Sequence, residues 1–381
     1  MRVAIIGTRG VPNFYGGFEQ FAEYLSSSLI EKGHQVTVYN SHDHPYQQDN
    51  WKGVQIIHCF DPEDKIGTIG QFIYDFNCIL DARRRKFDVI LQLGYTSSSV
   101  WGWLLPRKKC VVTTNMDGLE WKRTKYTKPV QSFLKWAEKL AVRYSDHLIA
   151  DSIGIQKYLK TKYQKEAIYI PYGATVFEKP DDSCLADYGL HKFQYNMLVA
   201  RLEPENNIET ILDGVVAANT NIPFLVIGKH ETVFGEYLKN KYSHMASIRF
   251  LGGMYDMYLL NNLRHYSNIY FHGHTVGGTN PSLLEAMASQ CFICAHNNIF
   301  NRSILGEDAF YFKNATEIAE VLKKEFKIDY FHLVRKNEEK IRLYYSWPKI
   351  VEQYLIHFKK ILGSVAIDET ITGPSKTSLI E

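Results

Sequence analysis

The sequence predicts an α/β protein built from two doubly wound domains that face each other across a cleft. Three observations lead to this prediction. The chain has 381 residues, and a single hydrophobic core stops growing at roughly 250–300 residues, so two domains are expected. Short apolar runs alternate with segments of helical periodicity, which is typical of parallel strands buried on both faces and joined by helices. Pro171 and Gly173 interrupt the alternation near mid-chain, as expected of a linker.

The predicted strands form two series, one on each side of this interruption. The first comprises Arg2–Ile6, Gln35–Tyr39, Val54–Cys59, Val89–Leu93, Cys110–Thr114, His147–Ala150 and Ala167–Ile170. The second comprises Asn196–Ala200, Phe224–Ile227, Ile248–Leu251, Ile269–His272, Phe292–Ala295 and Ala309–Phe312. We therefore expect domains at residues 1–172 and 176–345. A last helix at 346–362 has Pro348 in its first turn, and a tail at 363–381 is expected to be disordered or to serve in interactions.

Composition narrows the class of protein. The 44 basic and 41 acidic residues give a net charge of +3, which does not favour nucleic acid as the main partner. Six cysteines are scattered along the chain, and Cys291 and Cys294 lie in an apolar run. We expect buried thiols rather than a metal or redox centre, in a reducing cytoplasm. The chain opens with a strand rather than a signal peptide, and no run of about 18 apolar residues could cross a membrane.

The sharpest motif runs from Gly277 to Met287 and follows a predicted strand. Asn280 is expected to cap a helix that begins at Pro281. The two glycines at 277 and 278 let a ligand approach the backbone, and the free amides around Thr279 at the helix start form an anion site. Glu285 lies about one turn later, where its carboxylate could accept two ribose hydroxyls. The alternative is a well-capped helix whose acidic residue only balances the helix dipole.

A second motif, Arg201-Leu-Glu-Pro-Glu-Asn206-Asn207, follows the first strand of the second series. The carboxyl ends of such strands face the ligand site. The planar guanidinium of Arg201 suits a diphosphate. Taken alone, this motif would favour a surface salt bridge.

A third motif, Gly7-Thr8-Arg9-Gly10 through Gly16-Gly17-Phe18-Glu19, follows the first strand. It lacks the G-x-G-x-x-G spacing of dinucleotide-binding proteins. The amides of Gly16 and Gly17 could meet phosphate or sugar, and Arg9 adds a positive charge. A flexible connector is the alternative.

A fourth motif, Asn115 to Arg123, follows the strand predicted to end at Thr114. Asp117 and Glu120 are candidate contacts to an acceptor hydroxyl, and Trp121 could stack on a sugar ring. Helix capping by Asp117, with Glu120 at the third position, is the alternative.

The remaining signals concern metal, histidine and membrane. No D-x-D sequence occurs, so a divalent-metal clamp is not indicated, and cations and helix amides would take the charge of the leaving group. His274, just before the glycine loop, is a further candidate for the site. Basic-aromatic stretches at 101–109 and 122–128, both assigned to the first domain, could dock on anionic lipid. A solvated basic face is the other interpretation.

Together, the four motifs and their order along the chain resemble those of the GT-B-fold, family-4 retaining glycosyltransferases, and the resemblance covers nearly the whole chain. The more specific resemblance is to the bacterial rhamnosyltransferase subgroup. It is carried by Tyr15-Gly16-Gly17-Phe18-Glu19, by Asp117-Gly118-Leu119-Glu120-Trp121-Lys122-Arg123 and by Gly277-Gly278-Thr279-Asn280-Pro281-Ser282-Leu283-Leu284-Glu285-Ala286. It implies two Rossmann-like domains: an acceptor-binding domain at 1–172 and a nucleotide-sugar-binding domain at 176–345. The last helix would cross back onto the first domain.

The resemblance also implies roles for individual residues. Glu285 would hold the donor ribose and Arg201 the diphosphate, with the amides of Gly278 and Thr279 capping the phosphates. Gly16 and Gly17 would approach the donor from the other domain.

Two positions depart from the family pattern. Asn206 stands where the family often has a lysine as second diphosphate cation; Asn206 is still expected to contact the donor, and Arg9 is the substitute candidate for the cation. Gly277 stands where the family has a glutamate near the donor sugar. A 6-deoxy sugar has no 6-hydroxyl for such a carboxylate to bind, which agrees with rhamnose.

The expected reaction is sugar transfer with retention and without a cofactor, in the synthesis of bacterial surface polysaccharide. Asp117 would orient the acceptor, while Arg201 and Glu285 act on the donor. The partners implied are dTDP-rhamnose and a saccharide acceptor, lipid-linked at the cytoplasmic membrane face. Two other functions stay open: a sugar-nucleotide 2-epimerase, which needs acid and base groups at the sugar, and a non-catalytic nucleotide-sugar-binding protein.

Overall fold

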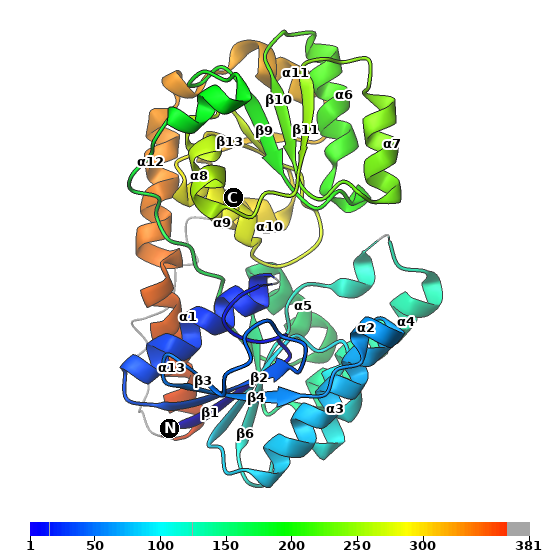
Figure 1. Cartoon of the computed structure of the whole chain (residues 1–381), viewed down its shortest axis with the longest axis vertical. Coiled ribbons are helices and arrows are strands. Elements are labelled where there is room, and N and C mark those ends of the chain that lie inside the picture. Colours follow the sequence, from blue (N-terminus) through cyan, green and yellow to red (C-terminus); the bar gives the residue numbers. More distant parts are fainter. Residues whose placement is uncertain (15, 124, 364–381) are drawn as a thin grey trace. The chain divides into compact units, whose positions relative to one another are not determined.

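The computed structural model describes residues 1–14, 16–123 and 125–363 (Figure 1). The chain divides into two compact units, which are described separately. Among the described residues, the first contains Met1–Trp121, Tyr126–Tyr172 and 347–363, and the second contains Gly173–Ser346 together with Lys122, Arg123 and Lys125. The predicted tail lies outside the described residues from position 364 onward.

The first unit is built on an eight-stranded sheet in the order β3-β4-β2-β1-β5-β6-β7-β8. Its strands are β1 (Arg2–Ile6), β2 (Gln35–Ser41), β3 (Asn50–Trp51), β4 (Val54–Cys59), β5 (Val89–Leu93), β6 (Val111–Asn115), β7 (His147–Ala150) and β8 (Ala167–Tyr169). All neighbours pair in parallel except β3 and β4. Central β1 is buried from Val3 to Ile6, which explains its uniformly apolar sequence.

Six α-helices belong to this unit within the described residues. They are α1 (Gly17–Glu31), α2 (Glu63–Ile66), α3 (Ile69–Arg84), α4 (Lys128–Tyr144), α5 (Ile153–Tyr163) and α13 (Trp347–Ile361), with 3-10 helices at Ser98–Leu104 and Glu120–Lys122. Helix α13 is distant in sequence but packs here. Thr113 Oγ1 and His357 Nε2 lie 2.9 Å apart, and the rings of Tyr24 and Trp347 stack at 4.3 Å.

The second unit contains a six-stranded, all-parallel sheet in the order β11-β10-β9-β12-β13-β14. Its strands are β9 (Asn196–Val199), β10 (Phe224–Ile227), β11 (Ile248–Gly252), β12 (Tyr270–His272), β13 (Ile293–His296) and β14 (Phe310–Phe312). Its helices are α6 (Ile208–Ala218), α7 (Val233–Lys241), α8 (Met257–Tyr266), α9 (Pro281–Ala288), α10 (Ile299–Leu305), α11 (Ala315–Lys324) and α12 (Phe331–Lys340). Short 3-10 helices lie at Ser183–Tyr188, Pro204–Asn206 and Lys327–Asp329, and a π-helix at Ile341–Tyr345.

All thirteen strands predicted from the sequence are present, with ends that differ by at most two residues. The prediction missed β3, which has only two residues and pairs antiparallel at the sheet edge, too short to show a period. All six thiols are free, and those of Cys59, Cys78, Cys291 and Cys294 are buried as expected, whereas Cys110 and Cys184 are only partly buried.

Candidate functional site

The glycine motif of the second unit forms the predicted capped helix. Asn280 is the N-cap, and its Oδ1 accepts a hydrogen bond from Ser282 N at 2.9 Å, with Pro281 at the first helical position. Gly277 has a φ of 135°, a conformation that residues with a side chain rarely adopt. Gly278 is half-buried and Thr279 is buried. The amides at the start of α9 therefore follow a backbone stretch that only glycine forms easily.

Hydrogen bonds connect the loop before α9 to the second predicted motif. Thr275 donates two hydrogen bonds to the Glu205 carbonyl, from its amide at 3.2 Å and its hydroxyl at 2.8 Å. Asn207 Nδ2 donates to the Gly273 carbonyl at 2.7 Å. A Cβ on Gly273 would lie 2.0 Å from the Asn206 carbonyl oxygen. The structure thus brings together two motifs that are about 70 positions apart in the sequence.

Arg201 lies just beyond the end of β9 with an exposed side chain. Its carbonyl accepts hydrogen bonds from Glu203 N at 2.8 Å and from Asn206 Nδ2 at 2.7 Å. Among the described residues, the Arg201 guanidinium makes no ion pair within 4.0 Å. Asn206 is buried, with 5% of its surface exposed. We predicted Asn206 as a donor contact, but its amide is bound to the backbone that carries Arg201.

Two further cations gather beside Arg201. Lys125 Nζ lies 2.9 Å from Glu203 Oε1, and Arg123 Nη1 lies 3.4 Å from Glu203 Oε2. Burial raises the pKa of Glu203, but the hydrogen bond from Lys125 and the charge of Arg201 outweigh it and hold that pKa below its usual value. We expected the basic stretch 122–128 in the first domain, but Lys122, Arg123 and Lys125 group with the second unit.

His274 lies between this cluster and the glycine loop. Its ring stacks on His272 at 4.4 Å, and its carbonyl accepts hydrogen bonds from Asn298 and Asn301. Burial, followed by the charges of Arg201 and Arg123, lowers the pKa of His274 to about 3. The imidazole is therefore neutral near pH 7 and adds no charge to the site.

Glu285 on α9 has a partner that the sequence did not reveal. Its Oε2 accepts a hydrogen bond from Arg264 Nη2 at 2.7 Å. The Arg264 side chain is 1% exposed, while that of Glu285 is 22% exposed. No acidic residue lies in the first turn of α9, so the helix-dipole alternative for Glu285 is wrong. One bond leaves the carboxylate with further acceptor sites.

The first unit has its own pocket, with a volume of about 310 Å³. It lies where β1, β4, β5 and β6 end, as expected for a doubly wound sheet. Its charged residues and amide and hydroxyl side chains include Thr8, Arg9, Glu19, Asp61, Glu63, Gln71, Asp75, Ser97, Asp117 and Glu120. Sequence analysis identified Arg9, Asp117 and Glu120 as candidates. It missed the acidic and polar groups after β4 and on α2 and α3, because their loops carry no glycine or cap motif.

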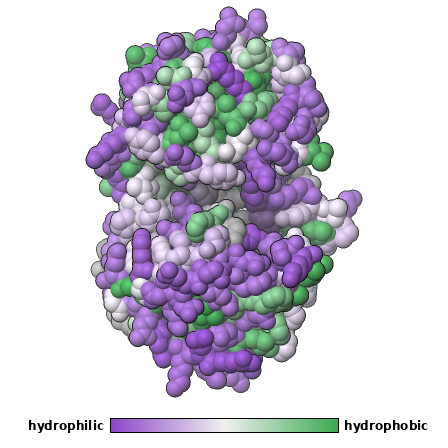
Figure 2. Space-filling model, in the orientation of Figure 1, coloured by the Kyte–Doolittle hydropathy of each residue, from purple (hydrophilic) through white to green (hydrophobic). Residues whose placement is uncertain are grey.

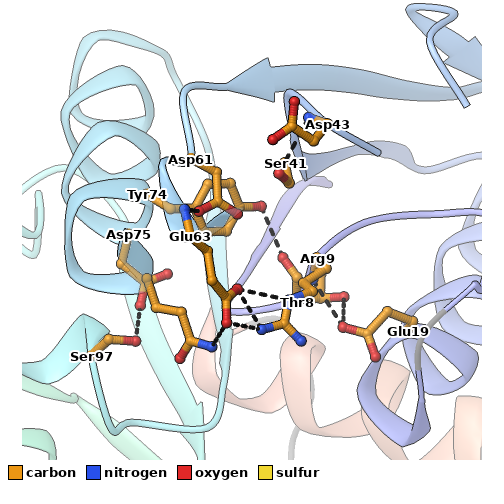
Figure 3. Close-up of polar contacts among 11 residues, drawn as sticks. Thr8, Arg9, Glu19, Ser41, Asp43, Asp61, Glu63, Tyr74, Asp75 and Ser97 are labelled. Carbon is orange, nitrogen blue, oxygen red and sulfur yellow. Dashed lines mark hydrogen bonds and ion pairs between the residues drawn. The ribbon is translucent and has the colours of Figure 1, made fainter. Parts of the chain in front are cut away.

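Arg9 forms part of the wall of this pocket (Figure 3). Its Nη2 lies 2.7 Å from Glu63 Oε1, and its Nε lies 3.2 Å from Glu63 Oε2. Gln71 Nε2 donates to the same Oε1 at 2.7 Å. Glu19, which is buried, accepts hydrogen bonds from Thr8 Oγ1 at 3.1 Å and from the Arg9 amide at 2.9 Å. We predicted Arg9 as a diphosphate cation, but the structure gives its guanidinium a carboxylate partner.

Asp75 is a buried acid in the same pocket. Its Oδ2 accepts a hydrogen bond from Ser97 Oγ at 2.5 Å (Figure 3). Burial raises the pKa of Asp75 from its ordinary 3.8 to about 7, although the Ser97 hydrogen bond opposes this. The pocket therefore carries one carboxyl group that changes charge near neutral pH.

The other predicted residues of the first unit divide into two groups. Gly17, Asp117 and Glu120 line the pocket, and Gly16 is the N-cap residue of α1. Trp121 is used differently from the prediction. Its Nε1 donates to Glu138 Oε2 at 3.0 Å, and Lys135 Nζ lies 4.6 Å from its ring centroid. Stacking of a sugar on that face of the ring would have to displace a cation.

No group of three or more His, Cys, Asp or Glu side chains within the described residues is arranged to hold a metal ion. None of their helices combines the length and apolar character needed to cross a membrane.

Comparison with known proteins places this geometry in context. Residues 1–175 match a family described as "Domain of unknown function (DUF1972)". A curated relative, "Uncharacterized 42.6 kDa protein in cps region" of Klebsiella pneumoniae, is 41% identical over 59 residues, which is 15% of this chain and 16% of that protein.

Solved structures are similar over nearly the whole chain. Sucrose-phosphate synthase from Thermosynechococcus elongatus has a TM-score of 0.75 at 16% identity and covers 96% of this chain and 100% of its own. Anabaena Alr3699/HepE, in complex with UDP and glucose, has a TM-score of 0.73 at 13% identity and covers 94% and 99%. Trehalose 6-phosphate synthase from Burkholderia multivorans has a TM-score of 0.68 at 12% identity and covers 96% and 99%. The chain therefore has the GT-B fold, with two Rossmann-like units.

Proposed function

We propose that this protein is a glycosyltransferase that takes its sugar from a nucleotide diphosphate donor. One observation carries the proposal: the second unit joins the start of α9, Arg201 and the cations Arg123 and Lys125 at one end of its sheet. Helix amides and guanidinium groups are the donors that bind a diphosphate. The solved structure of HepE with UDP and glucose supports the same class of ligand.

In this proposal the donor site acts on the leaving group. The bond between the anomeric carbon and the phosphate oxygen breaks, and the acceptor oxygen bonds to the same face of that carbon. The acceptor proton passes to the departing phosphate oxygen. Arg201 and the α9 amides stabilise the charge that develops on the diphosphate, without a metal ion, and Glu285 holds the ribose hydroxyls. Retention follows because attack and departure share one face.

The donor proposed is dTDP-rhamnose. Gly277 leaves the loop without a carboxylate at the position where the resembling family has one, which suits a sugar without a 6-hydroxyl. Structural neighbours that bind UDP and UDP-glucose make a UDP-sugar the competing donor.

The pocket of the first unit is the proposed acceptor site. Asp117 and Glu120 reach it from the fourth motif, and its lining combines hydroxyl, amide and carboxylate groups with apolar side chains such as Phe18 and Leu93. Such groups accept and share the hydroxyl protons of a sugar. Asp117 would orient the attacking hydroxyl. We propose a saccharide acceptor of bacterial surface-polysaccharide synthesis.

A lipid-linked acceptor is supported by the surface of α3 and α4. Phe72 and Phe133 pack together at 5.7 Å, and around them the side chains of Ile69, Val130 and Trp136 are exposed. Lysines 128, 135 and 139 are exposed on α4. Figure 2 shows hydrophobic residues among hydrophilic ones on the side of the first unit where α3 and α4 lie. This mixture suits peripheral contact with an anionic membrane, at the cytoplasmic face.

The proposal is tested by thermal-shift screening against dTDP-, UDP- and GDP-sugars, because a ligand that binds the folded state raises its apparent stability. Donors that bind are then incubated with saccharide acceptors, and the anomeric configuration of the product is read by NMR. Transfer with retention supports the proposal. A new sugar-nucleotide epimer formed without an acceptor would instead indicate a 2-epimerase. Binding without turnover on any acceptor extract would indicate a non-catalytic binding protein.

A further inference from the structure

Glu138 is a buried carboxylate on α4 that the proposed mechanism does not use. Its side chain is 1% exposed. Its Oε1 accepts hydrogen bonds from three groups of α5: the Tyr158 hydroxyl at 2.8 Å, Lys162 Nζ at 2.9 Å and the Tyr163 hydroxyl at 2.6 Å. Burying a carboxylate is costly unless it is paired and hydrogen-bonded. These three contacts supply one opposite charge and two neutral donors.

The other oxygen of Glu138 points to a different segment. Oε2 accepts the indole N–H of Trp121 at 3.0 Å. Lys135 Nζ and Lys162 Nζ lie 4.6 Å and 5.4 Å from the Trp121 ring centroid, within the range of cation–π attraction. The Glu138 carboxylate therefore connects α4 to α5 through Oε1 and to Trp121 through Oε2.

Trp121 directly follows a segment that forms one wall of the first-unit pocket. Asp117 and Glu120 line that pocket, as does Tyr95. The Tyr95 hydroxyl donates to the Gly118 carbonyl at 3.5 Å. Burial raises the pKa of Tyr95, and the charges of Glu138, Glu120 and Asp117 add to this effect, in agreement with Glu138 lying behind this wall. Asp117 has a φ of 45°, a conformation that costs a non-glycine residue energy unless neighbouring contacts hold it.

We propose that Glu138 is a positioning residue: it holds the Asp117–Trp121 segment in place through the Trp121 indole and so sets the acceptor wall of the pocket. The inference rests on the proposed function for its catalytic consequence. The mechanical part does not depend on it, because an anchored segment can be measured without any substrate.

The test compares two variants that cut the Trp121 link with one that does not. Trp121→Phe removes the indole N–H, and Glu138→Leu removes both acceptor oxygens. Tyr163→Phe is the matched control, because it removes a hydrogen bond to the same carboxylate on the α5 side. Amide hydrogen exchange of residues 117–121 is measured in all three variants. We expect at least about fivefold faster exchange in the first two, and wild-type exchange in Tyr163→Phe even if its global stability falls.

The second readout is steady-state kinetics with a donor and acceptor found as described above. Trp121→Phe and Glu138→Leu are expected to raise the acceptor KM at least about fivefold and leave the donor KM unchanged. The double variant should be no worse than Glu138→Leu alone, because both changes cut the same link. Faster exchange at 117–121 in Tyr163→Phe, or wild-type exchange in Trp121→Phe, would overturn the proposal. Absence of any transferase activity would count against the proposed function alone.

Discussion

The two units share one architecture but carry opposite charge where their strands end. The pocket of the first unit is lined by six carboxylates and a single arginine, which is itself paired: Glu19, Asp61, Glu63, Asp75, Asp117, Glu120 and Arg9. The corresponding end of the second sheet gathers three cations around one carboxylate: Arg123, Lys125 and Arg201 around Glu203. Ligands of such sheets bind where the strands end, so we expect the fold to set the place of each site and the loop residues to set whether it prefers a neutral or an anionic ligand.

The largest expected effect concerns the buried ion pair behind the second site. Glu285→Ala leaves the Arg264 guanidinium, which is 1% exposed, without its carboxylate. We expect the free energy of unfolding in urea to fall by about 3–5 kcal/mol. Glu285→Gln should lose less, because an amide oxygen can still accept the Arg264 hydrogen bond. Glu307→Ala is the control, since Glu307 is 93% exposed in its pair with Arg302. Equal losses in the two alanine variants would contradict a buried pair.

The next largest effect concerns the ionisation of Asp75, one of the acidic groups that distinguish the first pocket from the second site. The folded-state pKa of Asp75 is about 7, above its ordinary 3.8. The folded state therefore binds the Asp75 proton more tightly, and stability declines as the pH rises from about 4 to about 7. Asp75→Asn carries no such charge. We expect the variant to gain stability relative to wild type as the pH rises from about 4 to about 7, measured by urea unfolding at each pH. A constant difference across this range would mean that Asp75 ionises normally.

A smaller effect is expected in acceptor choice. The carboxylates of this pocket outnumber its one arginine and repel an anionic ligand, so a neutral saccharide should bind at least about tenfold more tightly than its uronic acid, or roughly 1.4 kcal/mol. Saturation-transfer NMR or calorimetry with matched saccharides measures this ratio. Glu63→Gln should lower the ratio of the two affinities, and high salt should lower it too, because ions screen the repulsion. Tighter binding of the uronic acid would contradict the proposed difference in ligand charge between the two sites.

The smallest effect distinguishes two roles for Asn206: support of the Arg201 backbone and direct contact with the donor. Its amide holds the Arg201 carbonyl at 2.7 Å, so Asn206→Ala should cost about 1 kcal/mol of unfolding free energy. Nucleotide affinity should then fall only a few-fold, through the loosened Arg201 backbone. A loss of tenfold or more in affinity with unchanged stability would restore the direct donor contact predicted from the sequence.

The sequence was sufficient for the features that repeat or follow local rules. Apolar runs located every strand longer than two residues, and Asn280 and Pro281 marked the start of α9. The motifs also indicated which loops would lie at the strand ends. Side-chain partners could not be predicted in this way, because tertiary packing chooses them. The Arg264–Glu285 pair joins α8 to α9, and Glu138 collects donors from α5 and from Trp121. An arginine within the apolar pattern of α8 was the only available hint of the first.

The central claim is that the second unit, rather than the first, binds the diphosphate. It is tested by calorimetric titration of UDP, dTDP and GDP into wild type, Arg201→Ala and Arg9→Ala. We predict that Arg201→Ala weakens the affinity of the bound nucleotide at least about tenfold, or roughly 1.4 kcal/mol. Arg9→Ala should stay within about twofold of wild type, because Arg9 is paired with Glu63 in the acidic pocket. Weakening by Arg9→Ala with no effect of Arg201→Ala would contradict the account.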